Sequence, residues 1–339
     1  MKARFFLISF LVLPVFAHAN GYLPPGVTPA IQRIIHNTIM QRYDSALAAC
    51  DSLEKKYPQH PVGYFFHAAT LQSRMMDYEA YNELDKFFEL TQKAINLAKD
   101  DSKTYPGSSW PHFFLGGAAG YEAMVRGRHN ELFRAFKDGL QSIRSLQTAL
   151  EIDSTNYDIY LGIGTYKYYR SQVSKYLKWL PFIADERETG KKMIRLAIEK
   201  GRFSRAAAIN GLFWILVKEE NYQEAEELIN LAVDENPGSR FFLWGKAKVH
   251  LKQEQWSQAI DAYKEILATY KAENVTSNYN EMQCYTSLGE AYFHLADYEQ
   301  ARSFSQMAID MSIDDYLKDR AKPIKERAKN LLKEIPSSQ

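Results

Sequence analysis

The chain has 339 residues, of which 46% are hydrophobic and 24% are charged, so it can build a large globular core. Its 42 basic and 41 acidic residues nearly cancel, and the sequence contains no long run of one sign. This balance argues against a nucleic-acid partner, because such partners require a basic surface.

Residues 1–19 have the pattern of a secretory signal peptide. Two basic residues precede an apolar run over 5–16, and residues 17–19 read Ala-His-Ala, the form of a cleavage site. The alternative is an uncleaved anchor, but a spanning helix needs about 20 apolar residues. We expect cleavage between Ala19 and Asn20 and export to a bacterial periplasm, or secretion. The mature chain would have 40 basic and 41 acidic residues and no transmembrane span.

Short motifs recur along the mature chain at a regular period. The pair Tyr222 and Ala225 returns as Trp256 and Ala259, and related motifs occur near the start and end of the chain. A unit of roughly 34 residues with small residues near positions 8 and 20, an aromatic near 17 and a proline near 32 resembles the tetratricopeptide repeat. The resemblance predicts units that begin near Thr28, Pro61, Pro111, Tyr157, Ala206, Arg240 and Met282.

The resemblance implies an all-α fold, a right-handed solenoid of about seven antiparallel helix pairs over residues 20–313. Some units are spaced more widely than the period, which predicts insertions near 85–105, 127–140, 172–188 and 270–280. Residues 314–339 are expected to form a capping helix and a tail, because the last unit would otherwise expose an apolar face. No alternation of period two predicts a strand.

The two cysteines fall in the first and last units. Helices pack about 8–10 Å apart, so Cys50 and Cys284 should lie tens of ångströms from each other, whereas a disulfide needs about 6 Å between Cα atoms. We expect two free, buried thiols that act as small apolar side chains.

No sequence motif indicates catalysis, a metal site or a cofactor. The chain lacks a phosphate loop, H-E-x-x-H and paired C-x-x-C motifs, and its eight histidines are scattered. The glycines of 115–120 lie in a helical pattern and favour close helix packing over phosphate binding. The acidic residues at 185–188 are interspersed with basic ones, which favours the solvated start of a helix over an acid–base pair. The prediction is a non-enzymatic protein.

In tetratricopeptide repeats, fixed positions on the first helix of each unit line a concave groove. Carried onto this chain, these positions imply a partner-binding face of aromatic, amide and lysine side chains, which would anchor a protein or peptide and bind its backbone or a carboxylate. The residues are Tyr168, Tyr169, Asn210, Trp214, Lys218, Phe241, Trp244, Lys248 and Lys252. The alternative, which the sequence leaves open, is that the two tryptophans only fill space between neighbouring helices.

The insertion near 172–188 separates the two helices of the central unit. The stretch 160–190 around it also resembles a eukaryotic tetratricopeptide family of the mitochondrial outer membrane, in which a G-x-G helix precedes a leucine-rich segment and an R-E-x-G turn. The matching residues are Gly162, Gly164, Arg187, Glu188 and Gly190. The resemblance supports the local structure, and no function is carried over from it.

The apolar residues of the insertion allow two interpretations. Leu177, Leu180 and Ile183 are spaced as one helical face requires, which favours a plug buried over the central unit. The alternative is an exposed contact site.

The predicted function is a scaffold in the cell envelope that holds a protein or peptide partner in the groove. The alternative is an accessory of outer-membrane or envelope assembly that docks on a membrane surface through the insertion. The side chains of such a peripheral contact would be Leu177, Trp179, Leu180 and Phe182. An enzyme with an unrecognised site is a third, weaker possibility.

Overall fold

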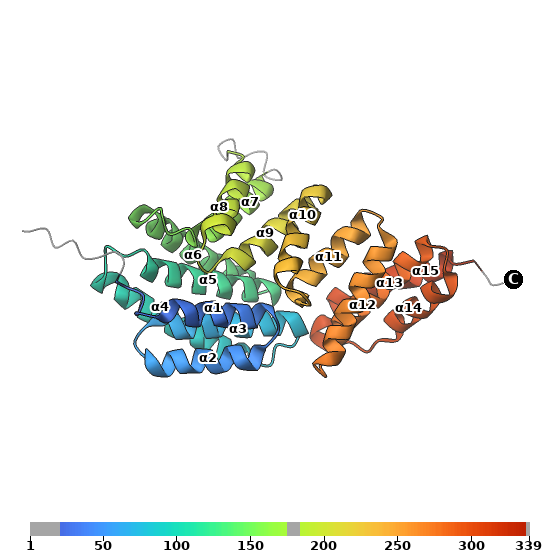
Figure 1. Ribbon diagram of the computed structural model, residues 1–339, viewed down its shortest axis with the longest axis horizontal. Coiled ribbons are helices and arrows are strands. Elements are labelled where there is room, and N and C mark those ends of the chain that lie inside the picture. Colours follow the sequence, from blue (N-terminus) through green and yellow to red (C-terminus); the bar gives the residue numbers. More distant parts are fainter. Residues whose placement is uncertain (1–20, 175–183, 337–339) are drawn as a thin grey trace, which may run out of the picture.

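The computed structural model describes residues 21–174 and 184–336, and within these ranges it contains fifteen α-helices and no strand (Figure 1). The predicted all-α fold is confirmed. In chain order the helices are α1 (Val27–Ile39), α2 (Tyr43–Lys56), α3 (Pro61–Tyr78), α4 (Leu84–Thr104), α5 (Trp110–Arg128), α6 (Leu132–Ile152), α7 (Ile159–Ser174), α8 (Arg187–Lys200), α9 (Arg205–Lys218), α10 (Tyr222–Glu235), α11 (Arg240–Lys252), α12 (Trp256–Ala272), α13 (Asn278–His294), α14 (Tyr298–Asp310) and α15 (Lys318–Glu334).

Consecutive helices form seven pairs, from α1–α2 to α13–α14, and α15 packs on both helices of the last pair. The predicted unit starts differ from the observed helix starts by at most four residues, the largest difference being Met282 against Asn278. Two of the stretches expected to carry extra residues, 85–105 and 127–140, fall mainly in α4 and α6, which have 21 residues each. There the additional residues lengthen helices instead of forming long loops.

The central pair, α7 and α8, is held at close range by two glycines. A Cβ added to Gly190 would lie 2.6 Å from the carbonyl oxygen of Gly164 and 2.9 Å from the backbone nitrogen of Tyr168. A Cβ added to Gly164 would likewise lie 2.6 Å from the carbonyl oxygen of Gly190. The two backbones therefore touch at a point where neither helix can carry a side chain.

The C-terminal ends of α1 and α3, in the first two helix pairs, are covered by other parts of the chain. In an open solenoid each unit contacts only its neighbours, but here the ends of α1 and α3 meet segments from the C-terminal half of the chain. The Oγ of Ser239 donates to the last carbonyl of α1, at Ile39, and the backbone nitrogen of Arg240 donates to Gln41. Figure 1 shows the resulting arrangement, with the N-terminal pairs lying against the units around α11 to α13.

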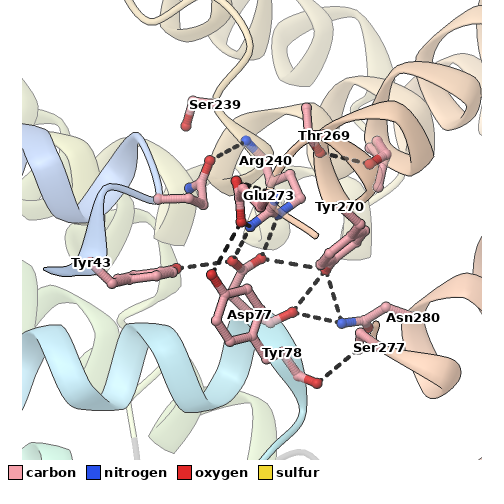
Figure 2. Close-up of polar contacts among 12 residues, drawn as sticks. Tyr43, Asp77, Tyr78, Ser239, Arg240, Thr269, Tyr270, Glu273, Ser277 and Asn280 are labelled. Atoms are coloured by element: carbon pink, nitrogen blue, oxygen red, sulfur yellow. Dashed lines mark hydrogen bonds and ion pairs between the residues drawn. The ribbon is translucent and has the colours of Figure 1, made fainter. Parts of the chain in front are cut away.

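A buried ion network forms the centre of this closure (Figure 2). The guanidinium of Arg240, at the start of α11, is fully buried and binds both Asp77 of α3, at 2.7 Å, and Glu273, at 2.6 Å. Tyr43 of α2 donates to the same Asp77 carboxylate at 3.0 Å. Burial alone would lower the pKa of Arg240, but the hydrogen bonds to Asp77 and Glu273 outweigh it and raise this pKa above its ordinary value.

The closure also satisfies backbone carbonyls at the end of α3, which have no partner within their own helix. Tyr270 and Asn280 donate to the carbonyl of Asp77 at 2.8 and 2.7 Å, and Ser277 donates to the carbonyl of Tyr78 at 2.8 Å. Side chains of α12, of α13 and of the residue before α13 thus complete the hydrogen bonding of a helix from the second pair.

A second carboxylate, Glu79, extends the closure to the C-terminal cap. Glu79 is buried and accepts hydrogen bonds from Arg128 at the end of α5 and from Arg320 of α15, the latter at 2.8 and 2.9 Å. Tyr316 donates to the Glu79 carbonyl at 2.7 Å. The capping helix therefore contacts the turn after α3 as well as the last unit.

Both cysteines are free and buried, as predicted. Burial raises the pKa of the Cys50 thiol to about 12 and raises that of Cys284 well above its ordinary value. Both thiols therefore remain protonated and unreactive.

Replacing Arg240 by Met should lower the free energy of unfolding by about 3–5 kcal/mol, because the largely buried Asp77 carboxylate would lose its charged partner. Arg195→Met is the matched control, since Arg195 pairs with Glu224 at the surface and its loss should cost less than about 1 kcal/mol. Urea denaturation followed by circular dichroism measures both. Equal effects would show that the closure is not what stabilises the fold.

Gly190→Ala should destabilise the chain by about 1–3 kcal/mol, because the methyl group would overlap the backbone of α7. Gly139→Ala in α6 should have the opposite sign and stabilise by about 0.5–1 kcal/mol, because alanine favours a helix. A Cβ at Gly139 would meet only Ala123, at 4.0 Å. Thermal melting of the two variants tests the prediction, which a lowered melting temperature of both would contradict.

Candidate functional site

Four of the predicted partner-binding residues form a cluster on α7 and α9. Asn210, Trp214 and Lys218 lie four residues apart and so share one face of α9. The indole nitrogen of Trp214 donates to Asn210 at 3.1 Å, and the ammonium of Lys218 lies 5.3 Å from the ring centroid of Tyr169 on α7. Trp214 is 39% exposed and Tyr169 is 42% exposed, so aromatic surface on this face meets solvent.

Tyr168, the neighbour of Tyr169, does not belong to this surface. Its side chain is fully buried in the core around Ile194 and Phe213, and its hydroxyl accepts a hydrogen bond from Gln172 at 2.9 Å. The register carried over from the repeat family included two adjacent tyrosines, which point about 100° apart on the helix. Here that difference directs Tyr168 into the core and leaves Tyr169 exposed.

The aromatic residues of α11 are less accessible. Phe241 packs on the core formed by α9 and α10, and Trp244 packs on the core of α11 to α13, with its ring 6.3 Å from that of Tyr263. Trp244 therefore fills the space between neighbouring helices, as the alternative interpretation of the two tryptophans states. This interpretation does not describe Trp214, whose ring is more open to solvent.

Positive charge gathers between Lys248 and Lys252 of α11 and Arg327 of the capping helix. Burial lowers the pKa of the Lys248 ammonium, and the charges of Arg327 and Lys252 lower it further, whereas Glu290 raises it. Arg327 of α15 binds Glu290 at 3.0 Å. In the described part of the chain Lys248 has no ion pair of its own, so this basic cluster of Lys248, Lys252 and Arg327 carries more positive than negative charge.

Sequence reasoning found the two lysines but missed Arg327. The residue lies in the segment assigned to the cap, and the repeat register assigns no groove position there. The abundance of Lys and Arg in α15 was the only available signal, and it does not indicate which of these side chains turns toward Glu290 and lies near Lys248.

The central insertion falls largely on residues 175–183, which lie outside the described residues. The predictions for Leu177, Trp179, Leu180 and Phe182, as a buried plug or as a contact site, therefore remain untested. On its C-terminal side, Asp185 accepts a hydrogen bond from the backbone nitrogen of Arg187 at 3.1 Å, where α8 begins. This agrees with the interpretation of the acidic residues as a helix start.

The described residues contain one group of side chains that could hold a metal ion, formed by Asp51, Glu54 and His67. Nδ1 of His67 lies 2.7 Å from Glu54, so a hydrogen bond already accounts for this pair. The group is on α2 and α3, away from the surface on α7, α9 and α11. No helix in the described ranges is both long and apolar enough to cross a membrane.

The family model of the tetratricopeptide repeat matches residues 240–314, which contain α11 to α14. The chain has an all-α, tetratricopeptide-like fold. A chain of the APC/C hetero-tetramer Cut9–Hcn1 is 14% identical with a TM-score of 0.53, and the alignment covers 88% of this chain and 54% of that one. This chain thus spans about half the length of that protein, and at this identity the likeness concerns the fold alone.

A second solved structure is the C-terminal part of a repeat-containing protein from Cytophaga hutchinsonii. It is 16% identical with a TM-score of 0.41, and the alignment covers 88% of this chain and 98% of that one. No curated protein matches the sequence.

Arg327→Met should raise the pKa of Lys248 toward its ordinary value, because the substitution removes one of the two positive charges that lower it. Isotope-labelled dimethyl-lysine signals, followed by NMR over a pH titration, report this pKa. Arg195→Met, which lies on α8 outside the basic cluster, is the control and should leave the titration of Lys248 unchanged. A Lys248 signal that titrates no lower than other lysines in the wild type would contradict the assignment.

Proposed function

We propose that this protein is a non-enzymatic scaffold of the cell envelope that holds a protein or peptide partner on the inner surface of α7, α9 and α11. Tetratricopeptide scaffolds generally mediate protein–protein interactions and are typically without enzymatic activity. The observation that carries the proposal is the exposed indole of Trp214, held by Asn210 and flanked by Tyr169 and Lys218. Rigid aromatic side chains of this kind are the usual anchors of protein interfaces.

The arrangement favours an extended partner with an apolar side chain and a nearby carboxylate. Trp214 and Tyr169 supply apolar contact area, and the basic cluster on the neighbouring helix supplies the charge. Because its pKa is lowered, Lys248 loses its charge at a lower pH than an ordinary lysine does. An anionic partner should therefore bind more weakly as the pH rises through this pKa.

The closure limits where a partner can bind. The ends of α1 and α3 are covered by Ser239, Arg240 and Asn280, so this end of the first two pairs is not available to a partner. The proposed binding surface is accordingly confined to the later units. Its location in the envelope rests on the signal-peptide pattern of residues 1–19, and a purified protein that begins at Met1 instead of Asn20 would overturn that part.

A photo-crosslinking amino acid at position 214 should capture discrete protein adducts in cells, identified by mass spectrometry. The same amino acid at Leu231 is the control, because Leu231 is also exposed but lies on α10, the second helix of its pair. Once a partner is identified, Trp214→Ala should weaken its binding about tenfold or more, as loss of an aromatic anchor does. Identical adducts from both positions would count against the inner surface as the binding site.

A further inference from the structure

The first turn of α6 carries the most exposed large apolar side chains in the described ranges. Leu132, Phe133 and Phe136 are 69%, 84% and 65% exposed, whereas no other large apolar residue described exceeds 53%. Single exposed apolar residues are common on protein surfaces, but a contiguous group usually marks a contact site. These three residues are not needed to pack α6, whose other side already meets α5.

The side chains of this turn are sorted by type around the helix. At about 100° per residue, Leu132, Phe136 and Phe133 form one continuous arc, and Lys137 and Arg134 form the next. The side that faces α5 borders the arc next to Leu132, and there Ala135 lies 3.9 Å from a Cβ added to Gly127. The exposed surface is therefore an apolar arc with a basic border, which we call the α6 tip.

The basic border of the α6 tip is only partly neutralised within the fold, because Arg134 has an acidic partner and Lys137 has none among the described residues. Glu131 is bound by Arg126 at 2.8 Å and by Arg134 at 3.1 Å, and Asp138 is bound by Arg126 at 2.9 Å. Lys137 has no ion pair among residues 21–174 and 184–336. Whatever covers the tip must therefore accept positive charge beside an apolar surface.

The tip also lies at one end of the hairpin formed by α6 and α7. A Cβ added to Gly162 of α7 would collide with Leu146 of α6. Gly162 and Leu146 therefore lie at the same height along the two antiparallel helices. At about 1.5 Å per residue, the first turn of α6 reaches as far as the last turn of α7. The apolar arc is thus at the end of the hairpin opposite the turn at 153–158.

We propose that the α6 tip docks on an anionic lipid surface. Phe and Leu side chains insert at the boundary of headgroups and acyl chains, and Lys and Arg beside them bind lipid phosphates. The charge favours this occupant over a second copy of the chain. A two-fold interface through the tip would bring its basic border against an identical one. The inference is independent of the proposed partner surface on α7, α9 and α11.

Sedimentation of the mature chain with vesicles of phosphatidylglycerol and phosphatidylethanolamine tests the proposal. The wild type should bind these vesicles and bind phosphatidylcholine vesicles much more weakly. The triple variant Leu132→Ser, Phe133→Ser, Phe136→Ser should lower binding about tenfold or more, because most of the inserting apolar area is lost. Lys137→Glu should lower it about fivefold or more at low salt, and less at high salt.

The control is Leu231→Ser with Met307→Ser, which removes exposed apolar side chains from α10 and α14 and should leave vesicle binding unchanged. All variants should keep the wild-type melting temperature, because the replaced side chains are exposed.

Any one of five outcomes would overturn the proposal. The wild type does not sediment with anionic vesicles, or the triple variant and the control sediment alike. The triple variant melts several degrees lower, which would mean that another part of the chain covers the tip. Light scattering reports a dimer that the triple variant abolishes, which would assign the tip to a second copy. A crosslinker at position 133 captures protein and no lipid, which would assign it to a protein partner.

Discussion

The guanidinium of Arg240 connects three parts of the chain that are distant in sequence. It binds Asp77 and Glu273 from a fully buried position at the start of α11, and Asp77 in turn accepts a hydrogen bond from Tyr43 of α2. A buried charge is costly unless it is paired and hydrogen-bonded. This network is therefore satisfied only when α2, α3, α11 and α12 are all in place, and it fixes one curvature of the solenoid.

The fixed curvature determines which surfaces remain open to a binding partner. It covers the inner ends of the first two pairs and attaches the capping helix to Glu79, so a groove that could extend along all seven pairs is reduced to its later part. There, Trp214 remains exposed and Arg327 reaches the surface beside Lys248. The closure thus gives the C-terminal cap two roles, one in stability and one in the charge of the candidate surface.

Most of the fold follows from local patterns that a single sequence carries. The repeat period located seven pairs and their starts, because close helix packing requires small residues at fixed positions, such as Gly164 and Gly190. The same register placed Asn210, Trp214 and Lys218 on one exposed face. It erred at Tyr168, where the register alone could not distinguish the buried from the exposed member of an adjacent pair.

The closure itself could not be predicted in this way. Asp77 and Arg240 are separated by 163 residues, and each has the ordinary appearance of a surface residue at a helix end. Repeat periodicity describes contacts between neighbours, whereas the overall curvature sums small rotations over many units. The exposure of the α6 tip was missed for a related reason, because an apolar residue in a helical pattern is by default assigned to the core.

The closure also has a consequence for how the chain folds. Open repeat arrays have mainly local contacts, so folding can begin in any unit and spread to its neighbours. Here, contacts such as Asp77 with Asn280 and Glu79 with Arg320 span 203 and 241 residues. Such long-range contacts slow folding, since a large loop must close before they contribute. During synthesis the first two pairs emerge long before α11 to α15 exist, so their inner ends stay uncovered until nearly the whole chain has been made.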